Sequence, residues 1–137
     1  MQNLTYALRF KGNAAPPGDD PGVLKVQASA ERPVELAGSA PGAAAQFASD
    51  VRMIDAATFD ENGSIDFGGG TRLTFATVGR GTVGPGAEEG VSMGAVIWRV
   101  VSGEGKLAGA TGFITSNFHF NMAGEVTDNQ LHVLFVP

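Results

Sequence analysis

Hydrophobic and polar residues alternate along several stretches of this chain, which is the pattern of β-strands with one buried face. Between positions 4 and 11, every second residue from Leu4 to Phe10 is apolar. Further runs of this kind, mostly bounded by glycine or proline, continue to the C-terminus, and we count about eight strands and no long helix. After the first, they cover residues 23–28, 34–37, 51–59, 64–67, 72–78, 91–101, 112–121 and 125–136. Such a series predicts antiparallel strands that close into a barrel or pack as a sandwich.

The segments between these runs predict turns, loops and one short helix. Pro41–Ala48 contains three consecutive alanines after Ser39, a suitable helix cap, and predicts one or two helical turns at most. Asn62-Gly63 predicts a tight hairpin turn, because this pair readily adopts the positive φ angles that such a turn needs. Residues 12–22 and 79–90 are rich in glycine and proline and predict loops.

Two of the predicted strands are apolar on both faces. In residues 95–101, Val96, Trp98 and Val100 alternate with Ala95, Ile97 and Val101, and residues 131–136 show a similar pattern. An antiparallel strand with one solvated face should carry polar residues on that side. Another subunit is the simplest cover for the second face, so we expect a homo-oligomer, with a long loop folded over the sheet as the alternative.

Composition limits the class of protein. The 137 residues, 43% hydrophobic and 17% charged, predict a single globular domain, 1–137. A net charge of −5 with nine scattered basic residues argues against nucleic acid as a partner. The chain has no cysteine, and no apolar run approaches the roughly 20 residues that cross a bilayer. With no signal-peptide pattern at its start, we expect a cytoplasmic protein without a membrane partner.

Two motifs have the spacing of ligand sites without the context these need. Gly79–Gly84 matches the dinucleotide pattern G-x-G-x-x-G, but Pro85 and Gly86 follow where a helix would have to begin. Asp60–Ser64 places oxygen ligands at alternate positions like a calcium loop, yet Thr71 stands where the bidentate glutamate should be. We therefore expect loops at both places, with no cofactor and no metal site.

The two histidines and one arginine are candidates for chemistry. His119 shares a strand face with Asn117, opposite Phe118 and Phe120. If the phenylalanines fill the core, His119 points outward, and if a ligand fills the barrel, Asn117 and His119 line a polar wall. Arg99 either points outward or anchors an anionic or carbonyl-bearing ligand. Tyr6, Arg99, Asn117 and His119 are the predicted ligand contacts.

No pattern identifies catalytic residues. His132 lies in an apolar strand, where a structural histidine with its hydrogen bonds satisfied is the simpler interpretation. No serine stands in a nucleophile elbow, so a conventional hydrolase triad is not supported.

The ten residues Gly103–Gly112 hold four glycines and join two strand-like runs. This connection, with the turn at Gly124 and the final strand, resembles the allene oxide cyclase and dirigent barrels over Val91–Pro137. The resemblance implies an eight-stranded antiparallel barrel, commonly oligomeric, whose cavity holds an apolar small molecule and favours its cyclisation or coupling without a cofactor. The family's catalytic carboxylate does not align with Glu35, Asp50 or Asp55.

The expected fold is therefore all-β, a small closed antiparallel barrel of about eight strands. The expected function is small-molecule binding, with cofactor-independent cyclase or isomerase activity on an apolar substrate. The alternative is a non-catalytic binding or structural oligomer whose barrel is filled by side chains, and whether the protein is an enzyme stays open. Interior size separates the two, since nine phenylalanines, one tryptophan and one tyrosine can fill a small barrel.

Overall fold

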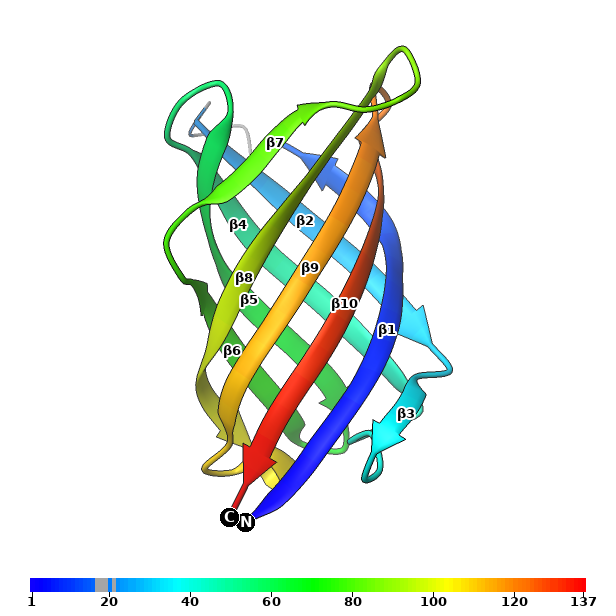
Figure 1. Ribbon diagram of the computed structural model, residues 1–137, viewed down its shortest axis with the longest axis vertical. Coiled ribbons are helices and arrows are strands. Elements are labelled where there is room, and N and C mark those ends of the chain that lie inside the picture. The colour runs from blue at the N-terminus through cyan, green and yellow to red at the C-terminus, as the bar shows by residue number, and fades with distance from the viewer. Residues whose placement is uncertain (17–19, 21) are drawn as a thin grey trace.

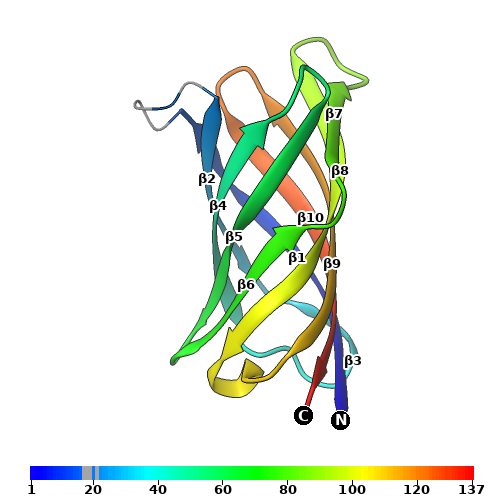
Figure 2. The same ribbon diagram turned by 90° about the vertical axis from the view of Figure 1, so that its left-hand side faces the viewer.

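The computed structural model, which describes residues 1–16, 20 and 22–137, is a closed antiparallel β-barrel (Figures 1 and 2). Both termini lie at one end of the barrel (Figure 1). The elements are β1 (Gln2–Ala15), β2 (Val23–Glu31), β3 (Val34–Ala37), β4 (Ala44–Met53), β5 (Thr58–Gly68), β6 (Thr71–Thr77), β7 (Gly81–Pro85), β8 (Val91–Glu104), the short 3₁₀ helix η1 (Gly105–Leu107), β9 (Thr111–Asn121) and β10 (Glu125–Val136).

The first and last strands close the barrel. They pair from Gln2 opposite Val136 to Asn13 opposite Glu125, and the remaining strands follow in the order β10-β9-β8-β6-β5-β4-β2-β1. The ten strands occupy eight barrel positions, because β6 and β7 share the place between β5 and β8, and β3 pairs only with β1. The predicted all-β barrel is confirmed.

The predicted hairpin at Asn62-Gly63 is wrong. Strand β5 runs straight through this pair, and its turn follows at Gly68–Gly70, where all three residues have positive φ. Gly63 is needed for a different reason: a Cβ there would collide with the carbonyl oxygen of Ala48 on β4. The glycine therefore permits close strand approach rather than a turn.

The predicted helical turn at Pro41–Ala48 is also wrong, since β4 begins at Ala44. Its residues alternate between buried and exposed, with Ala45, Phe47 and Ser49 facing the interior. Packing of this face into the barrel outweighs the helix propensity of the alanines.

The predicted loops are shorter than expected. Strand β1 extends to Ala15, and the predicted loop 79–90 contains β7. Of the predicted loop 12–22, residues 17–19 and 21 lie outside the described residues. The side chain of Asp20 pairs with Arg52 at 3.3 Å.

The glycine-rich connection joins β8 to β9, as predicted. Gly105 and Gly109 adopt φ angles of 64° and 74°, which let the chain reverse, and Leu107 between them is fully buried. The single turn of η1 is followed by β9, so a phosphate-binding helix is not formed here.

The half of the barrel nearer the termini, here termed the packed half, is filled with side chains. Trp98 stacks on Phe75 with ring centroids 4.2 Å apart, and both contact Phe47 at 5.5–5.7 Å. Fully buried Ile114 and Leu134 belong to the same core. This part of the interior matches the expectation of a barrel filled by aromatic residues.

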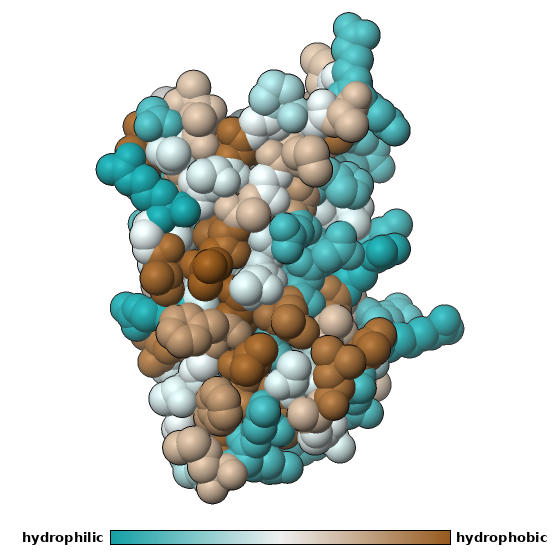
Figure 3. Space-filling model, viewed as in Figure 1, coloured by the Kyte–Doolittle hydropathy of each residue, from teal (hydrophilic) through white to brown (hydrophobic). Residues whose placement is uncertain are grey.

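Apolar side chains gather on the outside of β8–β10, with polar side chains between them (Figure 3). Ile97, Val101 and Phe113 are 49%, 52% and 55% exposed, while Val96, Trp98 and Val100 of the same region point inward and are buried. The predicted apolar character of both faces of residues 95–101 is thus confirmed. We refer to Ile97, Val101, Phe113 and Phe135 as the outer apolar face. Among the described residues, no helix has the length and apolar character needed to span a membrane.

Candidate functional site

A cavity of about 680 Å³ occupies the half of the barrel away from the termini, here termed the hollow half. It reaches the loops at that end, where Ala56, Gly90 and Met122 lie at its rim. Most of its wall is apolar. The residues that line it include Ala14, Val26, Phe47, Phe59, Glu61, Ser92, Ser116, Phe118, Phe120, Val126 and Asp128.

Small residues on the inward face keep this half open. Ala14, Gly84 and Ser92 stand at its wall, whereas the inward positions of the packed half carry residues such as Tyr6 and Trp98. Gly94 also points inward, and a Cβ there would collide with the carbonyl oxygen of Thr82 and with the ring of Phe118. The strand alternation is the same in both halves, and the side-chain volumes differ.

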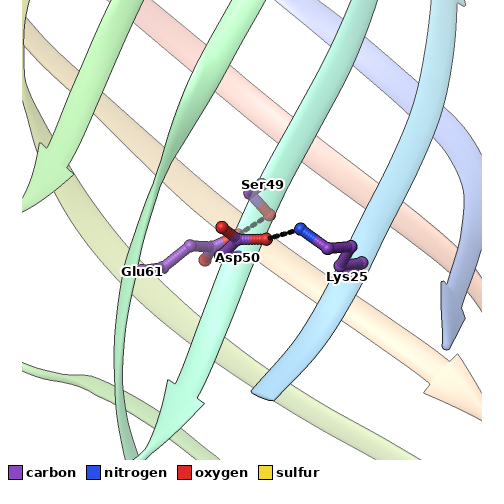
Figure 4. Close-up of polar contacts among 4 residues, drawn as sticks. All are labelled: Lys25, Ser49, Asp50 and Glu61. Atoms are coloured by element: carbon purple, nitrogen blue, oxygen red, sulfur yellow. Dashed lines mark hydrogen bonds and ion pairs between the residues drawn. The ribbon is translucent and has the colours of Figure 1, made fainter. Parts of the chain in front are cut away.

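Two carboxyl groups, Glu61 on β5 and Asp128 on β10, are the charged groups among the described residues that line the cavity. Each side chain belongs to a residue that is only 6% exposed. The hydroxyl of Ser49 donates to Glu61 Oε2 at 2.6 Å (Figure 4), and the hydroxyl of Ser116 donates to Asp128 Oδ1 at 2.6 Å. The two carboxyl groups are thus each held in place by a short hydrogen bond.

Burial raises the pKa values of Glu61 and Asp128 to different levels. It raises the pKa of Glu61 to about 8, and the charges of Asp128 and Asp60 act in the same direction, against the hydrogen bond from Ser49. Burial also raises the pKa of Asp128, to about 6, against the hydrogen bonds from Ser116 and Gln130. At neutral pH, Glu61 is therefore mainly a neutral acid and Asp128 mainly a carboxylate.

Trp98 lies close to Glu61. Among the described residues, its indole N–H meets no acceptor with good hydrogen-bonding geometry, although it is near enough to oppose the rise in the pKa of the Glu61 carboxyl group. A weak, poorly aligned contact is enough to oppose the rise in the pKa of Glu61, so this effect does not require a hydrogen bond from the indole N–H. Trp98 thus offers an unused donor at the boundary between the two halves.

A chain of hydrogen bonds links Asp128 to the packed half. Gln130 Nε2 donates to Asp128 Oδ2 at 2.8 Å, Gln130 Oε1 lies 2.8 Å from His132 Nε2, and His132 Nδ1 lies 2.9 Å from the Tyr6 hydroxyl. Because an amide oxygen only accepts, His132 must carry its proton on Nε2, and Tyr6 then donates to Nδ1. Burial lowers the pKa of His132 to about 3, which keeps the ring neutral as this arrangement requires.

The predicted ligand contacts are not brought together. Arg99, Asn117 and His119 lie on the exposed outer face of β8 and β9, so they cannot contact a ligand inside the barrel. Tyr6 points inward but lies in the packed half, bonded to His132. His132 is the buried structural histidine that the sequence predicted. Phe118 and Phe120 point into the barrel and line the cavity, and His119, on the other face of the strand, points outward.

Sequence reasoning missed Glu61 and Asp128. Glu61 sits in a polar stretch that was interpreted as a turn, which hid its place on the inward face of β5. Asp128 had a usable signal, because Val126, Asp128, Gln130, His132 and Leu134 form one face of β10, with three polar residues in succession. A polar run of this kind on the buried face of a strand marks an internal polar site.

Asp60–Ser64 is not arranged as a calcium loop. Asp60 and Glu61 point to opposite faces of β5, so one ion cannot bind both side chains. The described part of the chain contains no group of three or more His, Asp or Glu residues placed to hold a metal. Comparison of the chain with protein-family models, curated proteins and solved structures finds no match.

Proposed function

We propose that this protein binds an apolar small molecule in the hollow half and acts on it by proton transfer between Glu61 and Asp128. A cofactor-independent isomerase or cyclase fits this description. The observation that carries the proposal is the apolar cavity of about 680 Å³ with two buried, hydrogen-bonded carboxyl groups in its wall, whose pKa values are raised by burial to about 8 and about 6. Pairs of titratable groups whose pKa values are pushed apart are typical of acid–base sites.

The chemistry that this pair supports is proton abstraction next to a carbonyl group. The Asp128 carboxylate removes a proton from the carbon beside the carbonyl, while Glu61 gives its proton to the carbonyl oxygen, which yields an enol. In a substrate with a neighbouring carbon–carbon double bond, Asp128 returns its proton to the far carbon and the enol hydroxyl returns its own to Glu61, which moves the double bond. In a substrate with a second carbonyl group, the enol carbon attacks that carbonyl and closes a ring; the new alkoxide takes the proton from Asp128, and the enol hydroxyl returns its proton to Glu61. The apolar wall would orient the substrate, as the resemblance to allene oxide cyclase barrels also suggests.

The alternative of a barrel filled by its own side chains applies only to the packed half. Trp98, Phe75 and Tyr6 fill that region, whereas the hollow half exceeds the roughly 300 Å³ at which ligand pockets begin. A non-catalytic binding protein remains the second candidate, because binding needs the cavity and not the proton transfer. The experiment below separates the two.

The test is deuterium exchange of an apolar ketone, 2-decanone, in D₂O. We expect the wild-type protein to accelerate exchange beside the carbonyl, Asp128→Asn to abolish the acceleration, and Glu61→Gln to reduce it by about 10²-fold or more. Asp50→Asn removes a carboxylate from the outer side of the same wall, where Asp50 pairs with Lys25 (Figure 4), and should have no effect. Binding of 2-decanone without exchange would identify a binding protein, and absence of binding would contradict the proposal.

We also propose that the outer apolar face is covered by a second copy of this chain, which makes the protein a homo-oligomer in the cytoplasm. The exposure of Ile97, Val101 and Phe113 supports this. Soluble monomers rarely leave a large apolar patch exposed to water, so a gathering of exposed apolar side chains is typical of an interface. Light scattering after size-exclusion chromatography should give a multiple of 14.1 kDa. Phe113→Lys, in the middle of the face, should shift the mass to that of a monomer.

A further inference from the structure

The cavity wall carries negative charge without a positive partner. Glu61 and Asp128 line it, and no Lys, Arg or His does so among the described residues. The four residues outside the description, at positions 17–19 and 21, include no basic residue. Nearby basic side chains are engaged outside the barrel, where Lys25 pairs with Asp50 at 2.7 Å and Arg52 with Asp20. Buried charges are ordinarily paired, so the site is incomplete by one positive charge.

The hydrogen bonds at the two carboxyl groups do not replace that charge. Ser116 and Gln130 donate to the oxygens of Asp128, but both are neutral. At Glu61, Ser49 donates to Oε2 alone, and no donor to Oε1 is found among the described residues. Because Glu61 lines the cavity, this oxygen is available to a donor that enters from the cavity side.

The aromatic part of the cavity wall suits the body of an organic cation. Phe47, Phe59, Phe118 and Phe120 line the cavity, with the ring of Phe118 5.8 Å from that of Phe59 and 6.2 Å from that of Phe120. Aromatic faces attract cations as well as apolar groups. A bare metal ion fits poorly, because two carboxyl groups and apolar rings do not supply a third protein ligand of the usual kind.

We infer that the ligand of the cavity is a hydrophobic amine, bound with its ammonium group at Asp128 and Glu61 and its apolar body among the four phenylalanines. The ammonium N–H groups supply both the missing charge and a donor for Glu61 Oε1. A ligand with a carboxylate at this end is excluded, because it would place a third acidic group beside two others. This inference rests on the proposed function for the location of the site. It assigns both carboxyl groups to binding of the ammonium group and therefore favours the non-catalytic binding protein, the second candidate function.

The test is a charge series of three probes with the same ten-carbon chain: decylamine, decanol and decanoate. Isothermal titration calorimetry at neutral pH measures the affinity of the wild-type protein for each. We expect decylamine to bind at least about tenfold more tightly than decanol, since a charge-assisted hydrogen bond replaces a neutral one, and decanoate to bind most weakly. Equal or tighter binding of decanol or decanoate would overturn the inference.

Variants locate the preference at the two carboxyl groups. Asp128→Asn should reduce the affinity for decylamine about tenfold and that for decanol much less. Glu61→Gln, which leaves the hydrogen bonds of Asp128 intact, should reduce the amine preference by a smaller factor and serves if Asp128→Asn does not fold. Asp50→Asn changes the net charge equally on the outer surface and should leave the preference unchanged. A loss of preference in this control as large as in Asp128→Asn would overturn the inference.

The outcomes distinguish this inference from the proposed function. If decanol binds and decylamine binds no more tightly, the apolar binding site is supported and only the assignment of the ligand as an amine is overturned. Failure of all three probes to bind overturns both. Preference for decylamine without any exchange of 2-decanone supports the inference and identifies a binding protein rather than an enzyme.

Discussion

The packed and hollow halves of the barrel are built from the same strands and the same alternation, yet only one of them holds a cavity. Phe75 illustrates the packed half, since it is buried and stacks on Trp98 at 4.2 Å. Phe118 illustrates the hollow half, where its ring is half-buried and faces the cavity. The difference comes from the neighbours: Ala14, Gly84 and Ser92 leave volume that Phe118 and the other rings do not fill. A barrel of this size can thus combine a stabilising core and a binding site in one interior.

The polar groups follow the same division. Asp128 stands at the cavity, and the chain through Gln130 and His132 to Tyr6 carries its hydrogen bonds into the packed half. The packed half therefore fixes the orientation of Asp128 as well as the fold. Glu61 has one such bond, from Ser49 to Oε2, and its other oxygen accepts no hydrogen bond from the part of the chain that the structure describes.

The largest expected difference between the halves is the cost of removing a phenylalanine. Phe75→Ala leaves a void in a close-packed core and should destabilise the protein by about 3–5 kcal/mol. Phe118→Ala, the matched change in the hollow half, should cost about 1–2 kcal/mol, because its ring already borders empty space. Chemical denaturation of both variants measures the two values. Equal costs would mean that the hollow half is packed in solution.

The reverse substitution, which adds volume, should also distinguish the halves. Ala45 is buried in the packed half and Ala14 lines the cavity. Ala45→Leu overfills the core and should cost about 1–3 kcal/mol. Ala14→Leu should change the free energy of unfolding by less than about 1 kcal/mol and weaken decanol binding. Strong destabilisation by Ala14→Leu with unchanged decanol affinity would contradict the position of the cavity.

The smallest expected effect is the pH dependence that Glu61 gives to stability. Because burial raises the pKa of Glu61 from 4.5 in the unfolded chain to about 8, the folded state holds a proton that the unfolded state has released. Stability should therefore fall by about 1–2 kcal/mol between pH 6.5 and pH 8. Denaturation at the two pH values measures this.

Glu61→Gln should remove that fall, while Asp50→Asn should retain it. His132 acts in the opposite direction, because burial lowers its pKa to about 3 and stability is lost as the pH falls below 6.5. A wild-type protein that becomes more stable between pH 6.5 and pH 8 would show that Glu61 is ionised in the folded state.

The sequence was informative about the strands and less so about the site. Alternation in residues 4–11 and 91–101 predicted strands because burial of one face has a period of two. The prediction failed at Asn62-Gly63. An Asn-Gly pair is typical of a tight turn, but here the glycine is needed because β4 passes close to β5 at this point. The prediction also failed at Pro41–Ala48, where tertiary packing overrides helix propensity.

The site was hidden for a physical reason. Arg99, Asn117 and His119 were chosen by side-chain chemistry, but the register of β8 and β9 turns all three outward. Which face of each strand lies inside depends on closure of the whole barrel, and that closure pairs β1 with β10 across the length of the chain. The inward polar face of Asp128, Gln130 and His132 was visible in the sequence and was the better guide.

Amide NMR during titration with decanol tests directly whether an apolar probe binds in the hollow half. We expect chemical-shift changes at Val26, Ser92 and Val126 around the cavity, and little change at Leu73, Ile114 and Leu134 in the packed half. Changes confined to the outer apolar face, at Ile97 and Phe113, or no saturable change at all, would contradict binding in the hollow half.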